Sequence, residues 1–171
     1  MKTCSIIFIV VLAQGIGCAR SQPPQTAKIS KIEGKTVDFA YVLYGETHWV
    51  SDLRGKPLTL ILMRTSDIPS QVYMAEVKKA FPTIAGFTDF LVLTIEPSES
   101  PFVELYAESE KLPFPIGIAE EKVLLGMSPL GKIPLVPTTY FIDSNGKLKN
   151  ILLGVVQAQA IVQAALKLKS G

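Results

Sequence analysis

The chain contains very little cysteine. Its 171 residues include two, Cys4 and Cys18, and both lie close to the N-terminus. No thiol is present anywhere after residue 18. This absence excludes a disulfide, a thiolate nucleophile and thiol-based peroxide reduction from the main body of the chain, because each of these needs a cysteine sulfur.

Histidine is equally scarce, and neither sign of charge is in large excess. His48 is the single histidine, and 17 Lys and Arg residues stand against 15 Asp and Glu residues, with the signs interspersed. One histidine without a thiol is a poor ligand set for a soft metal ion, so we predict neither a metal site nor a cofactor. His48 and Trp49 are predicted to be an exposed pair or part of an edge strand. The balanced charge gives no indication of nucleic-acid binding.

The first 17 residues have the pattern of a bacterial export signal. Lys2 precedes an apolar run over Ile6–Ala13, and the small residues Gly15 and Gly17 follow it. The run is too short to be a permanent transmembrane helix. We therefore predict a signal peptide over residues 1–17 and export to the bacterial cell envelope.

The residue that follows this signal is Cys18. Gly17 directly before it favours lipoprotein processing, in which the cysteine thiol is acylated and becomes the new N-terminus. Ordinary cleavage after Ala19 is the alternative. On the first interpretation, residues 18–35 are a tether that holds the protein to a membrane through the lipid on Cys18, facing the periplasm.

Residues 36–171 are predicted to form one domain of alternating strands and helices. Strands are expected where short apolar runs lie between turn residues, and helices where apolar residues recur at helical spacing. In the helix expected over 101–112, Phe102, Leu105 and Tyr106 form an apolar side. The expected strands cover 37–44, 47–50, 58–63, 90–95, 114–118, 138–142 and 147–156, the first two as a hairpin, and the expected helices cover 69–84, 101–112, 120–127 and 157–169.

Four local segments occur in an informative order. The first is the turn segment Ser51-Asp52-Leu53-Arg54-Gly55-Lys56, and the second is the strand-to-helix junction that runs Met63-Arg64-Thr65-Ser66-Asp67-Ile68-Pro69-Ser70 and continues to Met74. Leu112-Pro113-Phe114-Pro115 is the third. The fourth is Val136-Pro137-Thr138, followed by an apolar strand and the turn Asp143-Ser144-Asn145-Gly146. A proline that opens a strand is unusual, because it cannot donate a hydrogen bond to the neighbouring strand.

With these four segments, residues 36–169 resemble the TlpA-like branch of the thioredoxin superfamily. The resemblance implies a thioredoxin-like α/β fold, with a central mixed sheet, helices on both faces and an N-terminal β-hairpin. It also implies that Asp67-Ile68-Pro69-Ser70 stands in place of the family's Cys-x-x-Cys, with Asp67 and Ser70 at the two thiol positions. In the same way it implies that Val136-Pro137-Thr138 is a loop in which Pro137 is cis and faces that turn.

Asp67 and Ser70 have a structural interpretation and a chemical one. Both are residue types that accept backbone N–H bonds near a helix N-terminus, and Asp67 also complements the helix dipole. A nucleophilic Ser70 would need a base within hydrogen-bond reach. The resemblance places His48, the single histidine, in the N-terminal hairpin and away from this turn. We therefore predict that Asp67 and Ser70 cap the helix and that neither is catalytic.

Two functions are compatible with these residues. The first is a redox-inactive module that binds a protein or peptide of the envelope in a groove between Ile68-Pro69 and Val136-Pro137. There Val136 would pair with an extended backbone, as the residue before the cis-proline does in active relatives. The second is a thiol–disulfide oxidoreductase of the cytochrome-c-maturation type whose thiols come from a partner.

Overall fold

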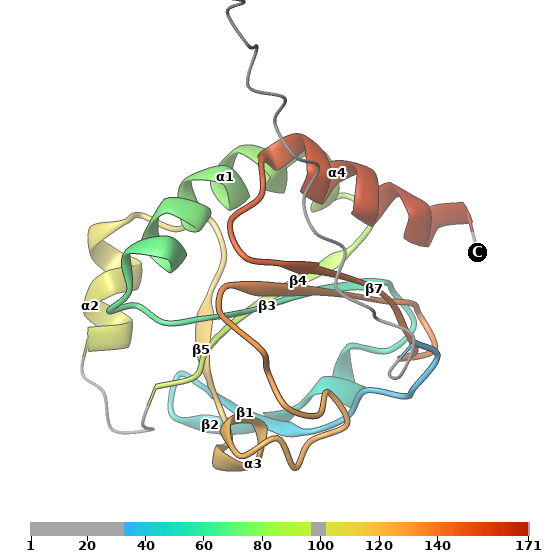
Figure 1. Cartoon of the computed structure of the whole chain (residues 1–171), viewed down its shortest axis with the longest axis horizontal. Helices are drawn as coiled ribbons and strands as arrows, with labels where there is room; N and C mark the ends of the chain where they lie inside the picture. The colour runs from blue at the N-terminus through green and yellow to red at the C-terminus, as the bar shows by residue number, and fades with distance from the viewer. Residues whose placement is uncertain (1–32, 97–101, 171) are drawn as a thin grey trace, which may run out of the picture.

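The computed structural model describes residues 33–96 and 102–170 (Figure 1). The predicted signal peptide, Cys18 and all but the last three residues of the predicted tether lie outside this part of the chain. No helix in the described part has both the length and the apolar character needed to cross a membrane. In chain order the elements are β1 (Ala40–Leu43), β2 (Glu46–Trp49), η1 (Val50–Leu53), β3 (Leu58–Met63), α1 (Ile68–Ile84), β4 (Asp89–Thr94), α2 (Phe102–Ser109), β5 (Ile116–Ala119), α3 (Glu121–Leu124), β6 (Thr138–Ile142), β7 (Leu148–Leu153), α4 (Ala158–Leu166) and η2 (Lys167–Ser170).

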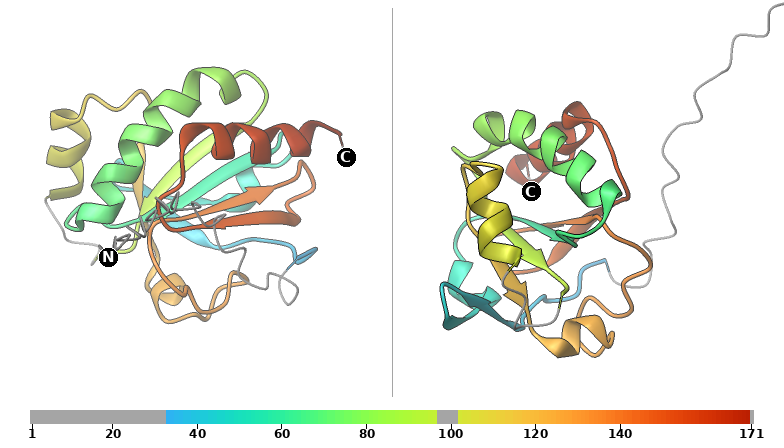
Figure 2. Two further views of the ribbon diagram at one scale, coloured as in Figure 1. Left: turned by 45° about the horizontal axis from the view of Figure 1, so that its top comes forward. Right: turned by 90° about the vertical axis from the view of Figure 1, so that its left-hand side faces the viewer.

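The strands of the described part form one mixed sheet in the order β2-β1-β5-β4-β3-β6-β7. β3, β4 and β5 run parallel to one another, whereas β6 is antiparallel to β3 and to β7. β1 and β2 form the predicted hairpin. α1 and α4 lie side by side on one face of the sheet (Figure 2), and α3 lies on the opposite side (Figure 1). This arrangement matches the predicted α/β fold, with helices on both faces.

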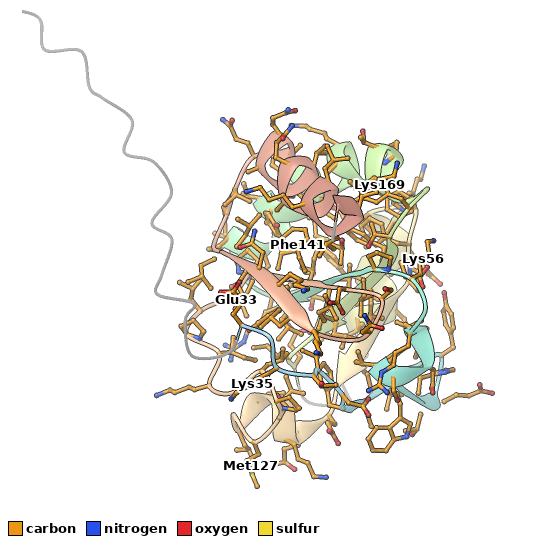
Figure 3. All side chains as sticks on the ribbon, turned by 90° about the vertical axis from the view of Figure 1, so that its right-hand side faces the viewer. Glu33, Lys35, Lys56, Met127, Phe141 and Lys169 are labelled. Carbon is orange, nitrogen blue, oxygen red and sulfur yellow. The ribbon has the colours of Figure 1, made fainter. Side chains whose placement is uncertain are left out.

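Strand β3 lies at the centre of this fold, because both its faces and both its edges are covered. All six of its residues are buried, and β4 and β6 pair with its two edges. Its side chains alternate between two cores, so Leu60 and Leu62 face one and Ile61 and Met63 face the other, which α1 and α4 close. Phe141 of β6 belongs to this second core and lies between the sheet and α4 (Figure 3). Burial of one such side chain contributes about 1.5–3 kcal/mol, so β3 has little freedom to shift.

Helix α2 exposes much of its predicted apolar side to solvent. It spans Phe102–Ser109, which is shorter than the predicted range 101–112. Phe102 and Leu105 share a side of the helix, but that side faces solvent, and the two residues are 65% and 61% exposed. The helix is anchored through Val103, which is buried in the core that α1 and α4 close. Helical spacing shows which residues share a side of a helix, but it does not show whether another element covers that side.

Candidate functional site

Asp67 lies between the end of β3 and the start of α1 and is the N-cap of that helix. Its backbone is extended, and its Oδ1 accepts a hydrogen bond of 2.9 Å from the Ser70 N–H. Pro69 lies in the first turn, where its missing N–H costs the helix no hydrogen bond. The prediction that Asp67 caps the helix is confirmed.

Ser70 does not cap the helix, and this part of the prediction is wrong. Its side chain is fully buried, and its Oγ accepts a hydrogen bond of 3.1 Å from the Arg64 N–H. Arg64 is the first residue after β3. The hydroxyl therefore ties the loop that precedes the helix back onto the helix. The sequence correctly predicted that the Ser70 hydroxyl accepts a hydrogen bond from a backbone N–H. It could not show that this donor, Arg64, lies in the loop before the helix.

The single histidine is far from this turn. His48 lies in β2 and stacks on Tyr41 of β1, with 5.6 Å between the ring centroids. Three strands, β1, β5 and β4, stand between β2 and β3 in the sheet. His48 therefore cannot serve as a base for Ser70. In the described part of the chain, no group of three or more His, Cys, Asp and Glu side chains is placed to hold a metal ion.

The loop before β6 lies beside the end of β3. Thr138 pairs with Leu62 in the antiparallel register, which brings Pro137 next to the last residue of β3. The Val136–Pro137 peptide bond is cis, as the resemblance implies. The Pro137 carbonyl accepts a hydrogen bond of 2.8 Å from the Gly154 N–H, and Thr138 Oγ1 donates one of 2.7 Å to the Leu135 carbonyl.

A buried hydrogen bond joins this loop region to α1. The Tyr73 hydroxyl and Thr139 Oγ1 lie 2.6 Å apart, and both residues are fully buried. Burial raises the pKa of Tyr73, so its hydroxyl stays protonated at neutral pH. Because Thr139 is the second residue of β6, this bond holds the first turns of α1 over the strand that carries the cis-proline.

Several apolar side chains on α1 and on the segments next to β6 and β7 are exposed. Ile68 and Val72 lie one helical turn apart on α1 and are 74% and 52% exposed. Glu76, one further turn along, accepts a hydrogen bond from the Ala158 N–H, so this row of α1 runs towards the segment that follows β7. Val155 in that segment and Leu135 in the cis-proline loop are also exposed. Exposed apolar residues thus come from three parts of the chain: the start of α1, the cis-proline loop and the segment after β7.

Glu96 is a site residue that sequence reasoning missed. It follows β4, and its carboxylate accepts hydrogen bonds from Thr65 Oγ1 at 2.6 Å, from Thr94 Oγ1 at 2.8 Å and from the Ser66 N–H at 3.1 Å. Burial would raise the pKa of Glu96, but these hydrogen bonds outweigh it and hold the pKa below its ordinary value. The available signal was an acidic residue directly after a buried strand that runs parallel to β3.

A cavity of about 360 Å³ lies beside Glu96. Thr65, Ser66 and Glu96 line one part of it, and α2 lines another. The cavity therefore adjoins the loop that leads into Asp67, although Val136 and Pro137 do not line it.

The hydrogen bonds at the turn predict the effect of removing them. Asp67→Ala should lower the free energy of unfolding by about 0.5–2 kcal/mol, because the Ser70 N–H loses its cap. Ser70→Ala should lower it by about 1–3 kcal/mol, because the Arg64 N–H loses its buried acceptor. Urea unfolding measures both. Asp67→Asn keeps an acceptor oxygen and should change stability by less than about 0.5 kcal/mol. A neutral Ser70→Ala would show that the buried hydroxyl has no structural role.

Two relatives in sequence are named thiol-disulfide oxidoreductase ResA. The protein from Geobacillus kaustophilus is 32% identical over 158 residues, which cover 90% of this chain and 88% of the relative. The protein from Geobacillus thermodenitrificans is 32% identical over 161 residues, which cover 92% of this chain and 90% of the relative. No protein-family model matches the chain.

Solved structures share the fold at lower identity. A secreted thiol-disulfide isomerase from Corynebacterium glutamicum superposes with a TM-score of 0.70 at 14% identity, covering 88% of this chain and 99% of that one. StoA from Bacillus subtilis superposes with a TM-score of 0.61 at 16% identity, covering 76% and 97%. These structures confirm the thioredoxin-like fold. Together with the identity to the two ResA proteins over most of their length, they show that the chain belongs to the family of thioredoxin-like thiol-disulfide oxidoreductases.

Proposed function

We propose that this chain is a redox-inactive member of the TlpA-like branch of its family and that it binds an extended segment of another protein. The observation that carries the proposal is the state of the Asp67–Ser70 turn. The side chains at both proposed thiol positions are engaged in structural hydrogen bonds. Their apolar neighbours Ile68 and Val72 are exposed.

The chemistry of the family supports the loss of redox activity. Thiol–disulfide exchange begins with attack by a thiolate on a disulfide sulfur. The sequence has no cysteine after Cys18, and a carboxylate or a hydroxyl cannot take the place of the thiolate in this step. The resemblance implies that Ile61 stands where thioredoxin has a buried acid that moves protons; Ile61 lies in an apolar core and cannot assist a proton transfer.

The binding role is supported by what surrounds the turn. The resemblance implies that the residue before the cis-proline, here Val136, pairs with the main chain of a bound segment. Exposed apolar surface is supplied by Ile68 and Val72 on α1, by Leu135 in the cis-proline loop and by Val155 after β7. Main-chain pairing would hold the segment, and the apolar side chains would select apolar residues in it. No electron transfer is needed for either contact.

We further propose that the protein is exported and anchored by a lipid on Cys18. The signal pattern over residues 1–17 and the Gly17–Cys18 junction support this location. One structural neighbour, the C. glutamicum isomerase, is described as secreted. The partner would then be a protein or peptide of the cell envelope.

Selection of peptides tests the binding role. Panning a random peptide library on the purified protein should enrich peptides with apolar residues. The variant Ile68→Asp/Val72→Asp should bind them at least about tenfold more weakly, because it places two charges in the apolar contact. Isothermal titration calorimetry measures the affinities. Tyr44→Asp, at an exposed aromatic residue in the β1–β2 turn, is the matched control and should bind normally. Enriched peptides that bind the double variant normally would contradict the proposed groove.

A thiol–disulfide oxidoreductase that uses a partner's thiols is the second candidate function. The names of the two ResA relatives favour it. The purified protein should not accelerate the reduction of insulin by dithiothreitol, because it has no thiolate to attack the insulin disulfides. Asp67→Cys/Ser70→Cys should form an intramolecular disulfide, which thiol titration would show as a loss of both thiols. Acceleration by the unaltered chain, measured as insulin turbidity, would instead establish the oxidoreductase function.

Metabolic labelling tests the anchor. A palmitate analogue should label the wild-type protein in the membrane fraction. Cys18→Ala should remove the label and either release the protein into the soluble fraction or block its processing. Cys4→Ala, within the signal, is the control and should leave the label in place. An unlabelled, fully soluble wild-type protein would show that cleavage follows Ala19 instead.

A further inference from the structure

The cavity beside Glu96 lies next to α2 and has properties that the proposed groove does not explain. Phe102 and Leu105 line it. They are three residues apart on one side of α2, where apolar residues usually pack against the core, but both are largely exposed. Its volume of about 360 Å³ lies near the lower end of the range for small-ligand pockets, about 300–1,000 Å³. It can therefore hold one large side chain.

Tyr106, on the same helix, contributes a polar atom without a partner. Tyr106 lines the cavity, while its hydroxyl oxygen is buried without a hydrogen bond in the described part of the chain. Burial, with a smaller contribution from the charge of Glu110, raises the pKa of Tyr106 to about 12. The hydroxyl is thus protonated at neutral pH. A buried polar group of this kind is destabilising until a ligand or water bonds to it.

Glu96 contributes a negative charge to the cavity. The three groups that bond to its carboxylate are neutral, and the lowered pKa keeps the carboxylate ionised at neutral pH. Among the described residues, no Lys, Arg or His lines the cavity and none forms an ion pair with Glu96. The site is complementary to a cation with apolar surface.

We propose that this cavity binds an arginine side chain of the partner protein. The proposal rests on the proposed function, because the arginine belongs to a segment bound beside the Asp67–Ser70 turn. The guanidinium group would donate hydrogen bonds to the two oxygens of the Glu96 carboxylate. The rings of Phe102 and Tyr106 and the side chain of Leu105 would cover its plane and its aliphatic stem.

The walls of the cavity favour arginine over lysine. A guanidinium is planar, is weakly hydrated and stacks on aromatic rings, and its several donors can serve two acceptors together. A lysine ammonium is a compact, strongly hydrated charge, and it loses more hydration when it enters an apolar cavity. Two aromatic residues beside a carboxylate with two oxygens therefore suit a guanidinium better than an ammonium.

Titration with a fragment of the arginine side chain tests the proposal directly. Butylguanidinium added to the purified, isotope-labelled protein should produce saturable NMR shifts at the amides of Thr65, Ser66 and Glu96. Neutral butylurea, which has nearly the same shape, should bind about tenfold more weakly, the difference expected when a charge-assisted hydrogen bond is replaced by a neutral one. Butylammonium should also bind more weakly than butylguanidinium.

Two variants locate the site. Glu96→Gln keeps an acceptor for Thr65 and Thr94 but removes the charge, and it should weaken butylguanidinium binding about tenfold. Phe102→Ala, at an exposed residue that the fold does not need, should also weaken it by removing a stacking surface. Glu104→Gln removes a carboxylate of the same helix that does not line this cavity, and it should bind the fragment normally.

The outcome separates this inference from the proposed function. Equal affinity for butylguanidinium and butylurea, tighter binding of butylammonium, or an unchanged affinity of Glu96→Gln would each overturn the assignment to arginine. Because the fragment needs no partner protein, these results do not depend on the peptide selection. Peptides that bind through Ile68 and Val72 while the fragment does not bind would leave the groove in place and remove the arginine pocket.

Discussion

The complete burial of β3 is the constraint on which the rest of the site depends. A six-residue strand covered on both faces and paired on both edges cannot slide by one residue, because every side chain would then point into the opposite core. Its end is therefore fixed, and so is the place where the chain turns into α1. The same register sets Thr138 opposite Leu62 and delivers Pro137 to the end of β3. The juxtaposition of turn and cis-proline loop is thus a property of the sheet and does not require cysteine.

This independence explains how the turn can keep its shape with other side chains at the proposed thiol positions. The Asp67 carboxylate accepts a hydrogen bond from the Ser70 N–H in the first turn of α1. The Ser70 hydroxyl accepts one from the Arg64 N–H in the loop before the helix, so the two side chains together hold the loop and the helix start in place. Tyr73 adds a buried bond to Thr139 on β6. These hydrogen bonds stabilise the geometry of the turn, but they do not replace the thiolate that attacks a disulfide in the family's reaction. The shape of the turn therefore does not depend on cysteine side chains.

The parts of the fold that the sequence predicts well are those in which local pattern and burial coincide. β3 and β6 have the predicted bounds, Leu58–Met63 and Thr138–Ile142, because each is a short apolar run that ends at turn residues. α2 is different, because the burial of each of its sides depends on elements that are distant from it in the sequence. Ser70 and Glu96 illustrate the same limit. Each has its role through a bond to a different segment, Ser70 to Arg64 and Glu96 to Thr65, and spacing along one segment does not reveal such bonds.

The two proposed recognition surfaces lie on either side of one short loop. Arg64 to Asp67 separates the cis-proline side, with its exposed Ile68 and Val72, from the cavity at Thr65, Ser66 and Glu96. Glu96 bonds to both Thr65 and Ser66, so the charge in the cavity is fixed to the loop that sets the start of α1. A segment bound across this loop would meet apolar surface first and then a negative charge between aromatic rings. Because the same loop adjoins both proposed surfaces, a partner would have to match apolar residues and a cation at a set separation. Such a requirement would give selectivity to the proposed non-covalent binding.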